Sequence, residues 1–264
     1  MRPDVSELWE FYSSRLGRLT QQRLQPQISF FWPDVRGQSV LGMGYAVPFL
    51  SPLIDEADRV VALMPATQGV MHWPSYPQTT DRRHDGLVTL APNYELPFED
   101  NCFDRIILVH GLEHAGRTRL LLREIWRVMA SGGRLLIIAP NRASPWAFVE
   151  RTPFGHGHPY SQSQLSRLLR DNMFQPLRRR GALYMPPWRS RLLLRAAAPI
   201  EQLGGRFGVG LPGVHLVEAE KQIFAASAIP APRIRVGAAV TVGVEKSLVV
   251  KQRISVDRAA SDED

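Results

Sequence analysis

The chain is poor in cysteine and has no long hydrophobic run. Cys102 is the single cysteine among 264 residues, which excludes an internal disulfide and predicts a reduced compartment. No apolar stretch approaches the roughly 20 residues that a transmembrane helix needs. The first residues, MRPDVSELWEF, lack the apolar core of a signal peptide. We therefore expect a cytoplasmic protein without a membrane contact.

Acidic side chains are too few to balance the basic ones. Asp and Glu number 25 against 32 for Lys and Arg, which gives a formal net charge of +7. Eight arginines lie between Arg167 and Arg195, with Asp171 as the acidic residue among them. Such a region can attract nucleic acid or an acidic partner. It lacks interleaved stacking aromatics, so a solvated face is the favoured interpretation and nucleic-acid binding the less favoured one.

Short apolar runs alternate with segments of helical spacing through the first half of the chain. Near-continuous apolar strands separated by helices predict a parallel sheet that is covered on both faces. An amphipathic helix is expected over residues 5–25, ended by Pro26. The expected strands are residues 39–43, 59–64, 86–90, 104–109 and 134–139, and the expected helices are 48–57 and 118–130, the latter stopped by Ser-Gly-Gly at 131–133.

The second half gives fewer signals. Ser161 and Gln164 form a capping-box pattern that predicts the start of a helix ending near Met173. Further elements are expected as a strand at 183–185, a helix at 189–203 and a long strand at 214–225. We predict one α/β domain over residues 1–227, with a helical lead-in at 1–35, followed by a flexible tail at 228–264.

Ligands of an open α/β sheet bind outside the carboxyl ends of its strands, where the winding reverses. In this sequence those ends fall at residues 42–46, 64–66, 91–95 and 110–114. A binding site is therefore expected from these four segments together.

Several short motifs occur in a characteristic order. They are Glu95-Leu96-Pro97-Phe98, Phe103-Asp104, Leu112-Glu113-His114, REIWRV at 123–128 and GGRL at 132–135. In order and spacing the chain resembles the class I S-adenosylmethionine-dependent methyltransferases of type 11, over roughly residues 8–225. This resemblance implies a doubly wound, Rossmann-like sheet of seven mostly parallel strands, in the order 3-2-1-4-5-7-6 with strand seven antiparallel.

The resemblance also implies S-adenosylmethionine as cofactor, but three acidic contacts of the family are missing. The first motif reads VLGMGYAVP at 40–48, with Gly42 in place of the acid and Ala46 and Pro48 in place of two glycines. Met64 stands at the position of the ribose acid and Pro92 at that of the adenine acid. A hydrogen bond to a charged group contributes about 1.5–3 kcal/mol, so losing the ribose contact alone weakens binding roughly tenfold to several hundredfold.

Candidate site residues follow from the same segments. The resemblance places His110 where the methyl donor's sulfur is approached, as a catalytic or substrate contact, and the alternative is an ordinary histidine at a strand end. Residues expected on the cofactor are Gly42, Gly44, Tyr45, Ala46, Met64, Pro65, Asn93, Tyr94, Glu95 and Leu96. Residues expected on the substrate side are His114, His156, His158 and Tyr160.

Two other patterns need weighing. Residues 110–114 fit the zinc-peptidase signature H-x-x-E-H, which requires a helix, but here the pattern follows a buried strand and a glycine, so no metal is expected. Met71, Trp73 and Tyr76 form an apolar cluster near the ribose position. That cluster is interpreted as a filled pocket, a lid or a partner surface.

Three functions remain open from the sequence. The first is transfer of a methyl group from S-adenosylmethionine to an acceptor, expected to be a small molecule. The second is a degenerate methyltransferase fold that binds or regulates a protein partner, as a dimer or hetero-oligomer, and the missing acids favour it. The third, an anion- or nucleic-acid-binding module using residues 167–195, is the least favoured.

Overall fold

The computed structural model describes residues 2–74, 87–188, 197–207 and 210–222. Within them the chain forms a seven-stranded sheet of order β3-β2-β1-β4-β5-β7-β6, in which β7 runs antiparallel to both neighbours. The doubly wound fold class and the strand order are confirmed. The strands are β1 (Ser39–Gly44), β2 (Arg59–Pro65), β3 (Val88–Ala91), β4 (Phe103–Val109), β5 (Met129–Pro140), β6 (Phe174–Ala182) and β7 (Val214–Lys221).

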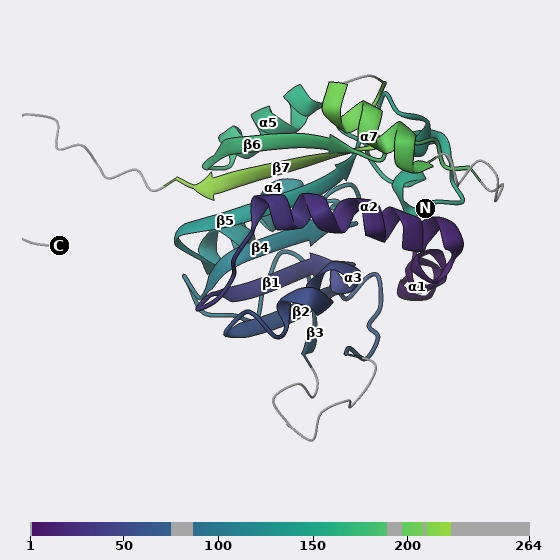
Figure 1. Ribbon diagram of the computed structural model, residues 1–264. Coiled ribbons are helices and arrows are strands. Elements are labelled where there is room, and N and C mark those ends of the chain that lie inside the picture. The colour runs from purple at the N-terminus through teal and green to yellow at the C-terminus, as the bar shows by residue number, and fades with distance from the viewer. Residues whose placement is uncertain (1, 75–86, 189–196, 208–209, 223–264) are drawn as a thin grey trace, which may run out of the picture. The chain divides into compact units, whose positions relative to one another are not determined.

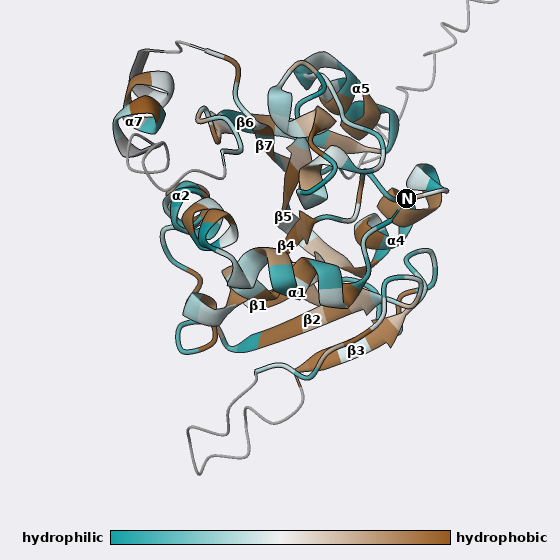
Figure 2. Ribbon diagram, turned by 90° about the vertical axis from the view of Figure 1, so that its right-hand side faces the viewer, coloured by the Kyte–Doolittle hydropathy of each residue, from teal (hydrophilic) through white to brown (hydrophobic). Residues whose placement is uncertain are grey.

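Helices cover both faces of the sheet (Figure 1). Residues of α1, α2 and α3 pack in one hydrophobic cluster with one face of the strands, while α4 and α5 pack in a second cluster on the other face. Figure 2 shows the strands as the most hydrophobic layer. The helices are α1 (Val5–Ser13), α2 (Arg15–Phe31), α3 (Val47–Leu50), α4 (Thr118–Val128), α5 (Gln162–Asp171) and α7 (Ala197–Phe207), with short 3-10 turns η1 (Ser51–Leu53), η3 (Pro145–Phe148) and η4 (Pro153–Gly155).

The N-terminal segment is two helices, so the prediction of one helix over residues 5–25 ended by Pro26 was wrong. Ser14 is extended and serves both helices: its N–H bonds back to α1, and its side chain accepts the N–H of Gly17 at 3.0 Å. The chain turns sharply because Gly17 lies against α1, where a Cβ would stand 1.9 Å from the Phe11 carbonyl oxygen. Pro26 lies inside α2. This turn brings α1 across the carboxyl ends of the strands, as Figure 2 shows from that edge.

Two predicted helices end earlier than expected. The helix predicted at 48–57 is the short α3 followed by η1, with Pro48 in its first turn. The helix predicted at 118–130 ends at Val128, because Met129 is already extended and opens β5. The predicted stop signal at 131–133 therefore lies inside β5. The capping box of Ser161 and Gln164 is confirmed at the start of α5.

The sixth strand was misplaced by the sequence analysis. It spans Phe174–Ala182, whereas Leu183, expected to begin it, has a φ of 60° and ends it. Strand β6 is an edge strand whose arginines are exposed, so it lacks the apolar pattern that predicts a buried strand. Arg178 forms an ion pair of 2.8 Å with the buried Glu218.

Some predictions lie outside the described residues. They are the first part of the helix expected at 189–203, the end of the strand expected at 214–225, and the tail at 228–264. Of the described helices, none is both long and apolar enough to cross a membrane.

Candidate functional site

A glycine turn follows β1 at the centre of the sheet. Gly44 has a φ of 75°, and a Cβ there would lie 2.1 Å from the carbonyl oxygen of Val109 in β4. This position therefore requires glycine. Gly42 is a packing position, because a Cβ on it would meet the side chains of Leu50 and Ala46. Tyr45 follows Gly44 in this turn and is buried, at 2% exposure, and its N–H donates to the carbonyl oxygen of Val109.

The carboxyl end of β2 is apolar and covered. Met64 is 1% exposed, and its sulfur accepts the N–H of Met71 at 3.4 Å. Pro65 is buried as well, and Trp73 packs in the same hydrophobic cluster as Met64. Of the three interpretations of the apolar cluster, a filled pocket describes Met71 and Trp73, while Tyr76 lies outside the described residues.

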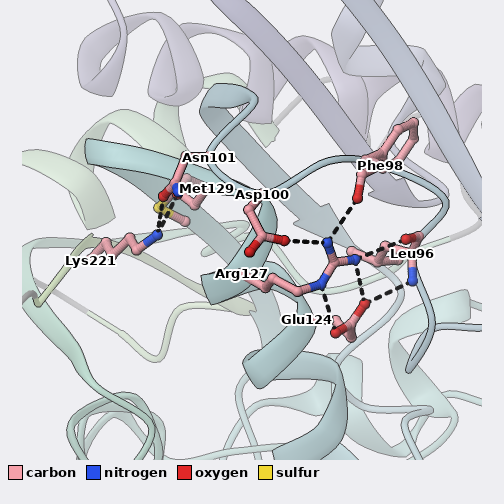
Figure 3. Close-up of polar contacts among 8 residues, drawn as sticks. All are labelled: Leu96, Phe98, Asp100, Asn101, Glu124, Arg127, Met129 and Lys221. Carbon is pink, nitrogen blue, oxygen red and sulfur yellow. Dashed lines mark hydrogen bonds and ion pairs between the residues drawn. The ribbon is translucent and has the colours of Figure 1, made fainter.

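The segment after β3 is held by one guanidinium (Figure 3). Arg127 donates to the carbonyl oxygens of Leu96 and Phe98, at 2.9 and 2.8 Å, and to the carboxylates of Asp100 and Glu124. Glu124 in turn accepts the N–H of Leu96 at 2.9 Å. Arg127 thereby fixes the loop in which the cofactor residues were predicted. Of these, Leu96 is buried, Asn93 is half-buried, and Tyr94 and Glu95 are exposed.

A buried polar chain lies at the carboxyl end of β4. The hydroxyl of Tyr12, from α1, is 2.8 Å from Nε2 of His110, and Nδ1 of His110 is 3.3 Å from Oε1 of Glu113. Exposure of the three residues is 6%, 1% and 1%. His110 has a φ of 51°, and its ring lies 4.6 Å from the ring of Phe154. The structure thus places the predicted catalytic histidine between a phenol and a carboxylate.

Burial controls the ionisation of this edge. Desolvation is the main cause that raises the pKa of Tyr12 well above 10, with the neighbouring Tyr45 and Glu113 adding to it. Burial likewise raises the pKa of Tyr45. It lowers the pKa of His114 to about 4, although Glu113 opposes this shift. Both phenols are therefore protonated and His114 is neutral near pH 7.

Helix α1 is anchored at both ends over the site. The guanidinium of Arg2 donates to the carbonyl of His114 and to the hydroxyl of Thr67, and the N–H of Val5 donates to the carbonyl of Gln68 at 2.9 Å. Several buried polar atoms of this edge have no hydrogen-bond partner among the described residues: both side-chain polar atoms of Gln68, Nδ1 of His110, both carboxylate oxygens of Glu113 and Nε2 of His114.

The predicted substrate-side residues do not line one cavity. His156 lines a cavity of about 590 Å³ between the α1–α2 turn and the segment around η4. His158 and Tyr160 line a different cavity, against α5. His114 is half-buried beside Glu113. Capture of a metal by these residues has no support, since no group of three His, Cys, Asp or Glu side chains in the described ranges could hold an ion.

Part of the chain is similar to known proteins. Residues 48–137 match the family model of a methyltransferase domain. Over that stretch the chain is similar to the class I S-adenosylmethionine-dependent methyltransferases. It is 30% identical over 133 residues to an uncharacterized protein of Mycobacterium bovis, covering 48% of this chain and 47% of the relative. A probable S-adenosylmethionine-dependent methyltransferase of Mycolicibacterium smegmatis is 30% identical over 142 residues, covering 53% of this chain and 52% of the relative.

Solved structures share the fold of this chain. A S-adenosylmethionine-dependent methyltransferase of Thermotoga maritima, described as a possible histamine N-methyltransferase, superposes with a TM-score of 0.58 at 15% identity. The match covers 83% of this chain and 96% of that one. The chain spans about half the length of the curated relatives it matches.

The family's cofactor is S-adenosylmethionine, and the residues present fit it at one part of the edge better than at another. They fit at the Gly44 turn, which has room only for a glycine, and at the buried side-chain atoms of Glu113 after β4 and of Gln68 after β2, which have no hydrogen-bond partner among the described residues. They do not offer the ribose a carboxylate, because Met64 occupies that position under Met71. Pro92, at the adenine position, is exposed. The open nucleoside crevice that the resemblance implies is instead covered by α1.

Two residues of the site are not among the predicted catalytic, cofactor or substrate-side residues. Tyr12 reaches His110 across 98 positions of sequence, and no local pattern announces such a contact. Glu113 was noted only as part of the zinc-like pattern. Its position three residues after His110 could have predicted their contact.

Proposed function

We propose that this methyltransferase transfers a methyl group from S-adenosylmethionine to a small-molecule acceptor. One observation carries the proposal: the family match runs through the segment that contains His110, which lies beside the glycine turn at the carboxyl edge of the sheet. That edge is where open α/β sheets bind their ligands. The missing ribose carboxylate predicts a weaker grip on the cofactor than the family usually has.

When bound, the cofactor supplies a methyl group on a sulfonium, and transfer breaks that carbon–sulfur bond, leaves its electrons on sulfur and joins the methyl to the acceptor. The chain's own residues position the reactants. Gly44 allows β1 and β4 to approach closely, and Arg127 fixes the segment after β3. His110, at the end of β4, would be the residue nearest the methyl donor. Positioning of this kind is the main contribution a protein makes to an in-line displacement.

The cavity lined by His156 suits an acceptor of small-molecule size. Its volume of about 590 Å³ lies within the usual range of ligand pockets, roughly 300–1,000 Å³. Phe11 lines this cavity and also touches Phe154, whose ring contacts His110. One aromatic layer therefore separates the cavity from the histidine, and an outward movement of α1 would join the two.

A second candidate function is a non-catalytic partner subunit. The packing of Tyr12 against Tyr45, with ring centroids 5.6 Å apart, favours it, because these side chains fill the edge that the cofactor would need. Under this alternative α1 stays closed and the fold is retained for contact with another protein.

Calorimetry with S-adenosylmethionine and with S-adenosylhomocysteine tests the proposal. We expect saturable heat with a dissociation constant of roughly micromolar to tens of micromolar, which corresponds to about −7 to −8 kcal/mol. ATP serves as the control ligand that shares the adenosine. Absence of heat at roughly millimolar S-adenosylhomocysteine contradicts enzyme function, and a stoichiometric partner that co-purifies with the chain would then favour the second candidate.

A further inference from the structure

A cavity of about 620 Å³ lies where the loop after β5, the start of α5, the end of β6 and the start of β7 meet. Helix α5 packs against β6 and β7 on this side of the sheet (Figure 1). We propose that this cavity binds the phosphate group of a small-molecule ligand. It shares no lining residue with the edge around Gly44 and His110 or with the cavity lined by His156. The proposal therefore depends neither on methyl transfer nor on cofactor binding.

The charge of the lining is positive. Arg142, Arg179 and Arg180 line the cavity, and none of the described residues that line it is Asp or Glu. Arg142 and Arg179 are exposed, and neither forms an ion pair within the described part of the chain. Arg180 is held from the α2 side, by Oε1 of Gln27 at 2.9 Å and by the ring of Phe30, whose centroid is 3.9 Å from the guanidinium carbon. Guanidiniums without a carboxylate favour an anion, and their paired N–H donors match two phosphate oxygens.

The amino end of α5 lies at the same cavity. Ser161, the N-cap, and Gln162, the first helical residue, both line it. The capping box uses the N–H groups of Ser161 and Gln164, and the other N–H groups of the first turn have no partner inside the helix. The amino end of a 10-residue helix such as α5 carries a partial positive charge, so it adds to the attraction for an anion.

A buried imidazole is the independent observation that points to a ligand. His215 lines the cavity from the start of β7 and is 8% exposed, and its Nε2 has no hydrogen-bond partner among the described residues. Burial lowers the pKa of His215, so the ring is neutral near pH 7 and carries one N–H. A buried polar atom without a partner is unfavourable, and a phosphate oxygen that accepts this N–H removes the penalty.

The backbone holds these groups in place. The side chain of Asn141 donates to the carbonyl oxygen of Pro212 at 2.8 Å, which joins the end of β5 to the start of β7. Gly181 pairs with His215 across β6 and β7, and a Cβ on it would lie 2.6 Å from Cβ of Pro212 and 2.8 Å from the hydroxyl of Tyr184. The close packing at Gly181 thus places the Tyr184 hydroxyl in the cavity wall, where it is a further hydrogen-bond donor.

The neighbouring cavity on the α2 side is less suited to an anion. It has a volume of about 640 Å³ and shares Arg179 and Arg180 with the first cavity. It also contains Glu201, whose carboxylate accepts the N–H groups of Leu183 and Tyr184, both at 2.7 Å. That carboxylate occupies the backbone donors and repels a second anion. The phosphate is therefore assigned to the α5 side of β6.

The form of the cavity favours a small molecule over a polynucleotide. Its volume lies within the usual range of ligand pockets, roughly 300–1,000 Å³, and Leu211 and Pro212 give the remainder of a ligand an apolar wall. A polynucleotide presents the same phosphate chemistry but binds along an extended basic groove with stacking aromatics. Such a groove is not continuous here, because Arg178, next to Arg179, is neutralised by Glu218.

Calorimetry of the full chain with phenyl phosphate, without cofactor, tests the site. We expect saturable binding with a dissociation constant of roughly 0.1–1 mM. Arg142→Gln and Arg179→Gln should each weaken it at least about tenfold, because each removes a charged hydrogen-bond donor. Arg170→Gln removes an exposed charge from the other end of α5 and is the matched control, which should leave the affinity unchanged. Unchanged affinity in both cavity variants, or no binding to the wild type, overturns the assignment.

Related ligands test the chemical class. Benzoate keeps the ring but carries a single charge, so we expect it to bind several-fold more weakly than phenyl phosphate, and benzyl alcohol should not bind. Equal affinity for benzoate overturns the choice of phosphate. A single-stranded oligonucleotide distinguishes the source of the phosphate. If it binds in a salt-dependent manner that Arg142→Gln and Arg179→Gln abolish, while phenyl phosphate does not bind, the small-molecule assignment is overturned in favour of a polynucleotide.

Nitrogen NMR of the histidine rings tests the contact with His215. Phenyl phosphate should shift the ring resonances of His215 and leave those of His156, which lines another cavity, unchanged. His215→Phe keeps a ring of similar size without nitrogen, and it should weaken binding at least about fivefold. If His215→Phe does not fold, the wild type decides: an unchanged His215 resonance at saturating phenyl phosphate overturns the contact.

Discussion

Gly44 is the residue on which the geometry of the edge depends most directly. In Gly44→Ala a non-glycine residue must adopt a φ of 75°, and its Cβ must avoid the Val109 carbonyl oxygen at 2.1 Å. The left-handed conformation alone costs about 1–2 kcal/mol, so we expect a loss of more than about 2 kcal/mol in denaturant unfolding.

Gly132→Ala is the matched control for that measurement. Gly132 has a similar φ of 73°, but nothing lies within 4 Å of the added Cβ. It should lose only the conformational cost of about 1–2 kcal/mol. Equal losses in the two variants would show that the contact between β1 and β4 does not constrain the turn.

His114 makes stability depend on pH. Its pKa in the folded protein is about 4, below the ordinary 6.5, because burial disfavours the charged ring. The unfolded chain therefore binds a proton first as the pH falls, and stability is full above about pH 6.5 and declines between pH 6.5 and 4. We expect a shallower decline in His114→Asn, measured by urea unfolding across this range, and no change of slope in the exposed control His158→Asn.

For single residues, the sequence predicted positions in the fold better than side-chain contacts. His110 could be named because it follows an apolar strand at the sheet's carboxyl edge. The contact with Tyr12 could not, because it depends on the path of α1 over the sheet. The roles expected for the cofactor and substrate-side residues stay predictions, and the substrate-side set is divided between two cavities.

Among the elements, the segment after β3 depends on a side chain of α4. Arg127→Met removes the donors to the carbonyl oxygens of Leu96 and Phe98, so we expect a loss of about 2 kcal/mol. Hydrogen exchange should rise at residues 95–98 in particular. Arg123→Met, at an exposed position of the same helix, is the control and should change neither quantity. Unchanged exchange at 95–98 in Arg127→Met would contradict the holding role.

Elements were predictable where the sequence carries a local signal. The apolar strands of the sheet centre and the capping box of α5 were found because periodicity and capping act within a few residues. The break at Ser14 was missed because helical spacing continues across it. Strand β6 was missed because Pro176 and three consecutive arginines, 178–180, resemble a loop, although an edge strand tolerates both. Arg178 pairs with Glu218, so this part of the basic region stabilises the fold.

For the whole molecule, the sequence and its family resemblance predicted the topology, and the position of the N-terminal helix over the site came from the structure. The topology follows from the order of strands and crossovers, and the apolar segments of the sequence mark where the strands lie. The position of α1 follows from tertiary contacts of Arg2, Val5 and Tyr12. The cytoplasmic location and the division at residue 227 stay predictions.

Cofactor binding should therefore be visible in the N-terminal helix. We expect S-adenosylhomocysteine to increase amide exchange in α1 by several-fold, because the helix must leave the edge, while exchange falls near Gly44 and His110. A nine-residue helix is marginal without its packing, so a displaced α1 would fray. ATP is the control ligand, and protection of α1 by S-adenosylhomocysteine would contradict displacement.

The close contact between the backbones of Gly17 and Phe11 makes the position of α1 depend on a residue of α2. A methyl group at position 17 has no room, so it would force α1 away from α2. Because the added carbon would meet the backbone of Phe11 and Tyr12, a change at position 17 can open access to His110 without contacting the histidine itself.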